Sequence, residues 1–319
     1  MSLNVGILAP GKGWGNFVSY ISSFKTISKA RNTNVILITK EFSSAKSYLE
    51  DQQFVKEFYE IPDNKRGFFK SIKYAFKLHK ILSRAKLDEI FIFHSSITLV
   101  LICYLAKIKK VYAPGIRYQN LFLKKKNKLY EKFFSKIIDP VEETKNLTKK
   151  ILNIDKIDFL PLKHNTTTDQ KLVGICIACS GPEKQWGVEN YIKLINFLIK
   201  NNYNKFLILS GIDQSNLEKI IVNNFSKPIE FIKTSTKTIG EVIPNLKKCK
   251  FVIGNDTGFS HLSVAYSKKT YVILGDCPPH TYSNLILPID KDDDVKRSID
   301  SIKTIKLEKV LNYLNKNLI

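Results

Sequence analysis

The sequence predicts an α/β protein with two domains, each built around a parallel sheet. Short runs rich in Val, Ile and Leu alternate with segments of helical periodicity, a pattern typical of parallel sheets covered by helices. The alternation breaks near residue 160 and restarts after a polar linker at residues 164–169. The chain has 319 residues, which is enough for two domains with a core each. We therefore expect domains at residues 1–160 and 161–319.

In the first half, the elements follow from their local patterns. A glycine-rich turn from Gly11 to Gly15 separates the first strand from the first helix. The helix at residues 68–87 is the clearest, because its apolar residues recur near helical spacing with basic residues between them. We expect strands at residues 4–9, 35–39, 57–61, 89–94 and 110–113, helices at 17–29, 43–50, 68–87 and 97–106, and a basic helical segment at 120–153.

The second half repeats the same alternation. We expect its strands at residues 172–178, 206–210, 229–231, 251–254 and 271–274. Its helices are expected at residues 188–201, 214–222, 238–248, 258–267 and 305–318. The pattern leaves open whether the last helix packs back on the first domain. Ligands of such sheets bind beyond the carboxyl ends of the strands, so the loops that follow the strands are the places to look for a site.

The chain is strongly basic, with a net charge of +22, and most of the excess lies in the first half. A surface of this kind attracts anionic lipid, an anionic substrate or nucleic acid. The alternative is lysine that serves only solubility. Nucleic-acid binding would rest on charge alone, because we find no binding motif and no platform of interleaved aromatic residues. We therefore expect no nucleic-acid partner.

Five cysteines, an odd number, do not suggest a disulfide framework, and they fit a reducing cytoplasm. Cys176 and Cys179 have the spacing of a redox or zinc motif. They lie in or beside an apolar strand with no second pair and no histidine at metal spacing, so a structural role is favoured and no metal is expected. No apolar run reaches the roughly 18–20 residues of a membrane span, and we expect no signal peptide.

The stretch from Gly254 to Leu262 carries the strongest functional signal. A strand is expected to end at Gly254 and a helix to begin near Thr257 or Gly258, with Asp256 placed to cap it. The amides of the first turn and the helix dipole favour an anion there, Thr257 adds a hydroxyl, and His261 lies near the same end. This combination suits a pyrophosphate. The alternative is an ordinary capped helix with a structural histidine.

Two further loops also follow strands. Ser180 and Lys184 place a hydroxyl and a cation after the first strand of the second half, as phosphate binding requires. Gly211 and Asp213 follow the next strand, where a carboxylate could accept hydrogen bonds from ribose hydroxyls. The alternative for Asp213 is a helix cap. Trp186 is expected to pack at the base of the domain.

These motifs, in this order, resemble glycosyltransferase family 9, the ADP-heptose:lipopolysaccharide heptosyltransferase family. The resemblance covers most of the second half, and the first half follows the family's order of elements more loosely. Its most specific element is the run Asp256-Thr257-Gly258-x-x-His261-Leu262. The other elements are Lys184-x-Trp186, the strand end Leu207 to Gly211 and the strand end Tyr271 to Gly275.

The resemblance implies the GT-B fold, in which two Rossmann-like domains face each other across a cleft. It implies an inverting transfer of heptose or a related sugar from a nucleotide diphosphate donor, with an ADP-sugar favoured and no metal required. The acceptor would be an anionic, lipid-linked glycan such as the lipopolysaccharide core, bound by the first domain. The protein would act in the cytoplasm, peripheral to the inner membrane.

The resemblance also assigns residues to the donor. Ser180 and Lys184 would contact phosphate. The pyrophosphate and the donor sugar would be held by Asp256, Thr257, Gly258 and His261. The cationic and amide groups of this set would stabilise the charge that develops on the leaving diphosphate.

The sequence departs from the family where the general base is expected. The family's glycine-rich turn commonly carries Gly-Asp, and here Gly15 is followed by Asn16, which cannot accept a proton at neutral pH. Another group such as His94 could serve as the base, Asn16 could position the acceptor, or the chain could be a catalytically impaired nucleotide- or glycan-binding protein. A second departure, residues 275–280 in place of the family's Pro-Thr-rich turn, leaves the donor sugar open.

Overall fold

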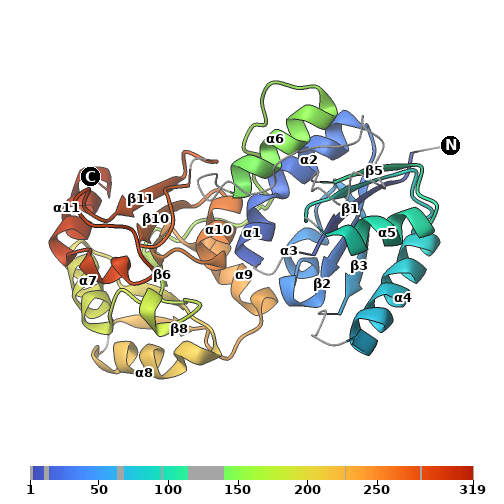
Figure 1. Ribbon diagram of the computed structural model, residues 1–319. Helices are drawn as coiled ribbons and strands as arrows, with labels where there is room; N and C mark the ends of the chain where they lie inside the picture. Colours follow the sequence, from blue (N-terminus) through green and yellow to red (C-terminus); the bar gives the residue numbers. More distant parts are fainter. Residues whose placement is uncertain are drawn as a thin grey trace. The chain divides into compact units, whose positions relative to one another are not determined.

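The computed structural model describes residues 3–10, 14–62, 68–94, 96–113, 140–226, 228–280 and 282–318. The chain divides into two compact units, Met1–Leu160 and Pro161–Ile319, and each is described by itself. Each unit holds one parallel sheet with helices on its faces, so the expected α/β class is confirmed (Figure 1). In the described part of the chain, no helix is both long enough and apolar enough to cross a membrane.

Unit 1 has a five-stranded sheet in the order β3-β2-β1-β4-β5. The strands are β1 (Val5–Ala9), β2 (Val35–Lys40), β3 (Val55–Ile61), β4 (Glu89–Ile92) and β5 (Lys110–Tyr112). The helices are α1 (Trp14–Ser19), α2 (Ile21–Ala30), α3 (Lys46–Leu49), α4 (Phe68–Ala85), α5 (Ile97–Leu105) and α6 (Pro140–Leu152). Helix α4 ends earlier than expected because Lys86 takes a left-handed conformation, with φ of 45°.

Unit 2 has a six-stranded sheet in the order β11-β10-β9-β6-β7-β8. The strands are β6 (Leu172–Cys176), β7 (Lys205–Leu209), β8 (Glu230–Lys233), β9 (Phe251–Asn255), β10 (Lys269–Leu274) and β11 (Ile286–Asp290). The helices are α7 (Val188–Lys200), α8 (Ser215–Asn223), α9 (Ile239–Lys248), α10 (Gly258–Ala265) and α11 (Leu307–Leu318).

Strand β11 and helix α11 complete unit 2. The sequence pattern did not predict β11, because Pro288 lies inside it and proline argues against a central strand. The strand pairs only with β10 at the edge of the sheet, where a proline is tolerated. Helix α11 packs against α7, and its Val310 and Leu314 belong to the core of unit 2.

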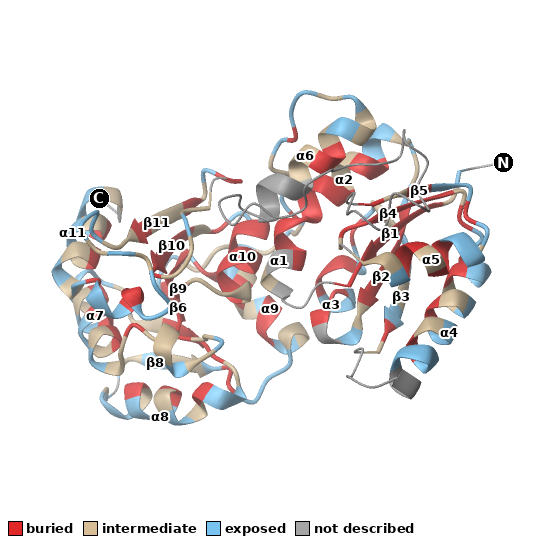
Figure 2. Cartoon of the chain, viewed as in Figure 1, coloured by how far each residue is buried: buried red, intermediate tan, exposed pale blue. Residues whose placement is uncertain are grey.

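The central strands of both sheets are buried, and their side chains build the cores of the two units (Figure 2). In unit 2, Val173 and Ile175 on β6 point to the face that α7, α8 and α11 cover. In unit 1, Ile36 and Ile38 on β2 pack with α4 and α5. Trp186 is buried in the core of unit 2, and its indole N–H donates to the carbonyl of Ile305 at 2.7 Å, as its expected packing role requires.

The strand order of unit 2 reverses between β6 and β9. The chain runs outward from β6 through β7 to β8, crosses to β9 on the other side of β6, and continues outward to β11. Parallel sheets bind ligands at such a switch point, because the loops after the two central strands diverge there. The strand ends at this point are Cys176 and Asn255.

At the switch point, β9 approaches β6 so closely that only glycine fits at position 254. Gly254 has a φ of 147°, and a Cβ atom there would lie 2.0 Å from the carbonyl oxygen of Cys176. Neither the backbone conformation nor the space admits a side chain.

We expect Gly254→Ala to lower the free energy of unfolding by about 2 kcal/mol or more, because backbone must move to relieve the clash. Urea denaturation of the purified chain measures this change. Gly211→Ala is the matched control, since its Cβ would meet only the Gln214 side chain at 3.3 Å. Equal stabilities of the two variants would contradict this account of the strand contact.

Candidate functional site

The residue after Gly254 fixes the start of the loop that follows β9. Asn255 is 2% exposed, and its side-chain oxygen accepts a hydrogen bond from the hydroxyl of Tyr191 at 2.5 Å. Its amide nitrogen donates to the carbonyl of Ala178 at 3.2 Å. The carbonyl of Asn255 in turn accepts from the hydroxyl of Ser260 on α10 at 2.7 Å. Asn255 therefore joins the ends of β6 and β9 to the first turn of α10.

Asp256 is the centre of the candidate site. Its Oδ2 atom lies 3.0 Å from Nε2 of His280 and 2.9 Å from Sγ of Cys277, whose thiol donates to it. Its Oδ1 atom lies 3.4 Å from Nε2 of His261. The hydroxyl of Tyr282 lies 2.6 Å from Nδ1 of His261, so this imidazole is held at both nitrogens. Helix α10 and the loop after β10 thus both supply side chains to one carboxylate.

The neighbours of Asp256 keep it ionised. Burial alone would raise the pKa of this carboxyl, but the hydrogen bonds and charges of His261 and His280 hold its pKa well below the ordinary value. Burial raises the pKa of the Cys277 thiol to about 11. The site therefore presents a fixed negative charge that is surrounded by groups able to donate hydrogen bonds.

The start of α10 differs from the expectation in one respect. Asp256 was expected to cap the helix, and that assignment is wrong. The N-cap residue is Thr257, which makes no side-chain capping hydrogen bond, because its hydroxyl lies 3.0 Å from Sγ of Cys176. The carboxylate of Asp256 instead contacts His261, His280 and Cys277. Gly258 is the first residue of the helix, so the first turn carries no side chain there.

Lys184 lies in the short helical turn Pro182–Lys184 that follows β6. Its ammonium forms an ion pair with Asp276, from the loop after β10. Burial lowers the pKa of Lys184, but the ion pair with Asp276 outweighs this effect and raises its pKa overall. Lys184 therefore stays charged beside the Asp256 cluster. Ser180, expected to contact phosphate with Lys184, is exposed in the same loop.

The loop after β7 holds Gly211 and Asp213. The amide of Gly211 donates to the side chain of Gln214 at 3.1 Å, and Asp213 is exposed in the turn Ile212–Gln214. The buried carboxylate in this region is Glu218 on α8, which the sequence reasoning did not select. It accepts from the hydroxyls of Ser210 at 2.6 Å and Ser235 at 2.7 Å. Glu218 thereby joins the loops that follow β7 and β8.

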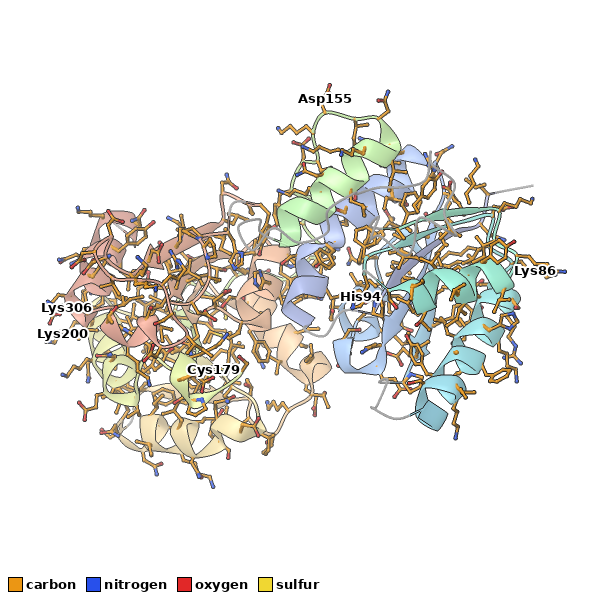
Figure 3. All side chains as sticks on the ribbon, viewed as in Figure 1. Lys86, His94, Asp155, Cys179, Lys200 and Lys306 are labelled. Carbon is orange, nitrogen blue, oxygen red and sulfur yellow. The ribbon has the colours of Figure 1, made fainter. Side chains whose placement is uncertain are left out.

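Unit 1 has a cavity of about 290 Å³ beyond the carboxyl ends of β1, β2 and β4. His94, labelled in Figure 3, follows β4 and lines this cavity. The other lining residues are Pro10, Lys40, Tyr74, Ser96, Thr98 and Leu99. Asn16 lies on α1, and its side chain is outside the described part of the structure.

Sequence reasoning selected Asp256, His261 and Lys184, and the structure places all three at one end of the unit 2 sheet. It did not select Asp276, Cys277 and His280 as site residues. Their only signal was that residues 275–280 differ from the pattern of the resembling family. Asn255 and Tyr282 gave no local signal, because their roles depend on contacts between distant loops.

The sequence model of glycosyltransferase family 9 (heptosyltransferase) matches residues 99–313. The search of curated proteins found no significant match.

Solved structures share the fold. A glycosyltransferase family 9 protein from Veillonella parvula DSM 2008 matches with a TM-score of 0.79 at 14% identity, over 99% of this chain and 98% of that one. E. coli ADP-heptose lps heptosyltransferase II matches with a TM-score of 0.77 at 16% identity, over 98% of each chain. E. coli heptosyltransferase WaaC with ADP-2-deoxy-2-fluoro heptose matches with a TM-score of 0.73 at 14% identity, over 98% of this chain and 99% of that one. These likenesses confirm the expected GT-B class of two parallel α/β sheets.

We expect Asp256→Asn to destabilise the chain at neutral pH by about 2 kcal/mol, because the charge that orders His261 and His280 is lost. A carboxyl whose pKa is lower in the folded state than in the unfolded state stabilises the fold when the pH is above the unfolded-state pKa, near 3.8. This contribution is lost as the pH falls towards the folded-state pKa. The difference between variant and wild type should therefore shrink below about pH 4.

Urea denaturation as a function of pH measures this difference. Asp213→Asn, which alters an exposed carboxylate, is the control and should change the stability little. A difference for Asp256→Asn that grows as the pH falls would contradict the assigned charge state.

Proposed function

Since the chain belongs to glycosyltransferase family 9, we propose that it transfers heptose or a related sugar from an ADP-sugar to a lipopolysaccharide-core or other bacterial surface-glycan acceptor, with inversion at the anomeric carbon. The chain is a glycosyltransferase by its family. The nature of the sugar and nucleotide is supported by the structures it resembles, which include a heptosyltransferase with an ADP-heptose analogue.

One arrangement carries this proposal. At the switch point of unit 2, the first turn of α10 lies beside the Asp256–His261 pair. Lys184 stands near Asp256, whose charge contributes to its raised pKa. A helix start and a lysine together suit a diphosphate, because backbone amides and an ammonium both stabilise phosphate oxygens. Gly258 has no side chain, so a ligand could approach the backbone of the first turn closely. We assign the donor diphosphate to this place.

The charges of the site fit the departure of a diphosphate. As the bond from the anomeric carbon to the diphosphate breaks, negative charge develops on the leaving oxygen. Lys184 and the α10 amides would stabilise that charge in place. The ion pair between Lys184 and Asp276 must open for this, so phosphate would replace the Asp276 carboxylate at the Lys184 ammonium. Asp256 and His261 would hold the donor sugar, and Ser180 would add a hydroxyl.

The loops after β7 and β8 suit the nucleoside. Gly211 and Asp213 follow β7, and Glu218 holds this loop against the one after β8 through Ser210 and Ser235. We assign the ribose to Asp213 at the exposed edge of this region. Glu218 would keep the two loops in register rather than contact the ligand, because its carboxylate oxygens already accept hydrogen bonds within the protein.

The acceptor would bind in unit 1. The 290 Å³ cavity there combines the Lys40 ammonium, the His94 imidazole and the start of α5 at Ser96. This combination suits an anionic saccharide. With Asn16 at the family's base position, we assign the general base to His94, whose imidazole can take a proton from an acceptor hydroxyl near neutral pH. Asn16 would position the acceptor.

The proposal includes the place where the enzyme works. A lipid-linked acceptor lies at a membrane surface, and the net charge of +22 would draw the protein to anionic lipid. We therefore place the reaction in the cytoplasm, at the inner face of the inner membrane. The binding-only alternative rests on Asn16 alone, and family membership does not favour it.

The donor site is tested with a panel of ADP-, UDP- and GDP-sugars, following release of the nucleoside diphosphate. We expect turnover with an ADP-sugar, and we expect Lys184→Ala and His261→Ala each to lower kcat/KM roughly 100-fold because diphosphate stabilisation is lost. Lys200→Ala, an exposed lysine at the end of α7, is the control (Figure 3). Both variants behaving like wild type would contradict the site.

The base is tested separately. We expect His94→Gln to lower kcat about 100-fold with little change in the KM for the donor, because proton removal is lost while donor binding is kept. Asn16→Asp, placed in the His94→Gln background, should restore activity by returning a carboxylate to the family's base position. Full activity of the His94→Gln single variant would show that another group is the base.

A further inference from the structure

The turn after β10 brings two ligand-type side chains to Asp256. Gly275 is packed so tightly that a Cβ atom would lie 2.2 Å from the backbone nitrogen of Ile302. Arg297 donates hydrogen bonds to the carbonyls of Gly275 and Cys277 and pairs with Asp290 at 2.7 Å. The turn is therefore held in one conformation, with Cys277 and His280 directed at the carboxylate.

The three side chains offer a thiol, an imidazole and a carboxylate within a small volume. The ligand atoms of Asp256, Cys277 and His280 all lie within 4.8 Å of one another. Oδ2 of Asp256 is 2.9 Å from Sγ of Cys277 and 3.0 Å from Nε2 of His280. Ligand atoms around a tetrahedral zinc ion, bonded at about 2.0–2.3 Å, lie about 3.3–3.8 Å apart. A shift of well under 1 Å in each side chain would open this triangle to an ion.

The surroundings of the triangle also match a metal centre. The second oxygen of Asp256, Oδ1, faces His261 at 3.4 Å, and His261 is itself held by Tyr282. Groups around a metal site commonly orient its ligands, and His261 is placed to orient the Asp256 carboxylate in this way. The side chains of His280 and Asp256 are 13% and 18% exposed, so solvent reaches the cluster only in part.

We propose that Asp256, Cys277 and His280 form a binding site for one divalent transition-metal ion, with Zn²⁺ the ion that fits best. A sulfur, a nitrogen and an oxygen ligand suit zinc and related metals rather than Mg²⁺ or Ca²⁺, which prefer oxygen ligands alone. Binding converts the Cys277 thiol into a thiolate and releases its proton to solvent. The ion uses Oδ2 of Asp256 and leaves Oδ1 to His261.

Three protein ligands leave a fourth position on a tetrahedral ion. Zinc sites that take part in a reaction keep such a position for water or substrate. Lys184 pairs with Asp276, which precedes Cys277 in the same turn, so its ammonium lies beside the cluster. If the donor diphosphate binds beside Lys184, as the proposed function holds, a phosphate oxygen takes the fourth position. No metal is expected from the sequence, and two of the three ligands, Cys277 and His280, lie in the turn that departs from the family's pattern.

Cobalt is the probe for the test, because Co²⁺ takes zinc sites and a bound thiolate gives a near-ultraviolet charge-transfer band. The full-length chain is treated with EDTA, dialysed and titrated with CoCl₂. We expect one Co²⁺ per chain, a thiolate band and visible bands of tetrahedral intensity, all removed by added Zn²⁺. Cys277→Ser should abolish the thiolate band, and His280→Ala should weaken Co²⁺ binding roughly tenfold or more.

Cys179→Ser is the matched control, because Cys179 is a partly exposed cysteine of the same unit whose thiol is not among the ligands. This variant should keep the band. Circular dichroism and thermal unfolding of each metal-free variant separate a lost ligand from a lost fold. The absence of a thiolate band in the folded wild-type chain, or a band that survives Cys277→Ser, overturns the proposal.

A second arm adds ADP to the Co²⁺-loaded and the EDTA-treated chains. We expect ADP to change the visible bands and to bind more tightly to the loaded chain. If ADP binds but the chain shows no Co²⁺ site, the metal proposal is wrong and the proposed donor site stands. If Co²⁺ binds with the predicted variant pattern but neither ADP nor any sugar nucleotide binds, the metal proposal stands and the proposed function is contradicted.

Discussion

The contact of β9 with β6 at Gly254 is the constraint on which the rest of the site depends. Because the carbonyl of Cys176 occupies the space of a Cβ atom, the two central strands of unit 2 meet at their carboxyl ends. Asn255 then joins the end of β9 to helix α7 through Tyr191 and to the loop after β6 through Ala178. Asp256 and α10 begin directly after this joint, so their positions are set by the sheet rather than by the loop.

A fixed carboxylate at the switch point organises the remaining loops electrostatically. The anion at Asp256 attracts the imidazoles of His261 and His280 and the thiol of Cys277, while Lys184 is paired with Asp276 beside them. Opposite charges are thus arranged in pairs before any ligand enters. Under the proposed function, an anionic ligand would replace Asp276 at Lys184, so the Lys184 ammonium would keep an anionic partner.

Much of the fold could be predicted from the sequence, because strand and helix periodicity are local properties. The two α/β halves needed no knowledge of distant contacts, and the strand ends predicted at Gly254 and Ser210 lie within one residue of the observed ends at Asn255 and Leu209. Strand β11 was missed because Pro288 is acceptable only at a sheet edge, and edge position is a property of the whole sheet. Helix lengths were overestimated where Lys86 and Ser267 turn left-handed.

The candidate site was predictable only in part, for the same reason. The order of motifs placed Lys184, Asp256 and His261 after neighbouring strands, and the structure brings the three to one end of the unit 2 sheet. The role of Asp256 as a cap was wrong, because the sequence does not show that His280 and Cys277 would reach its carboxylate from a loop 20 or more residues away. The structural role of Glu218 also depends on two separate loops.

The central claim is that the diphosphate of a sugar nucleotide binds at the start of α10 beside Lys184. A crystal structure of the chain with ADP tests it most directly. The account predicts the β-phosphate against the amides of Gly258 and Phe259, with the Lys184 ammonium turned from Asp276 to phosphate. Nucleotide bound elsewhere, with the Lys184–Asp276 pair intact, would contradict it.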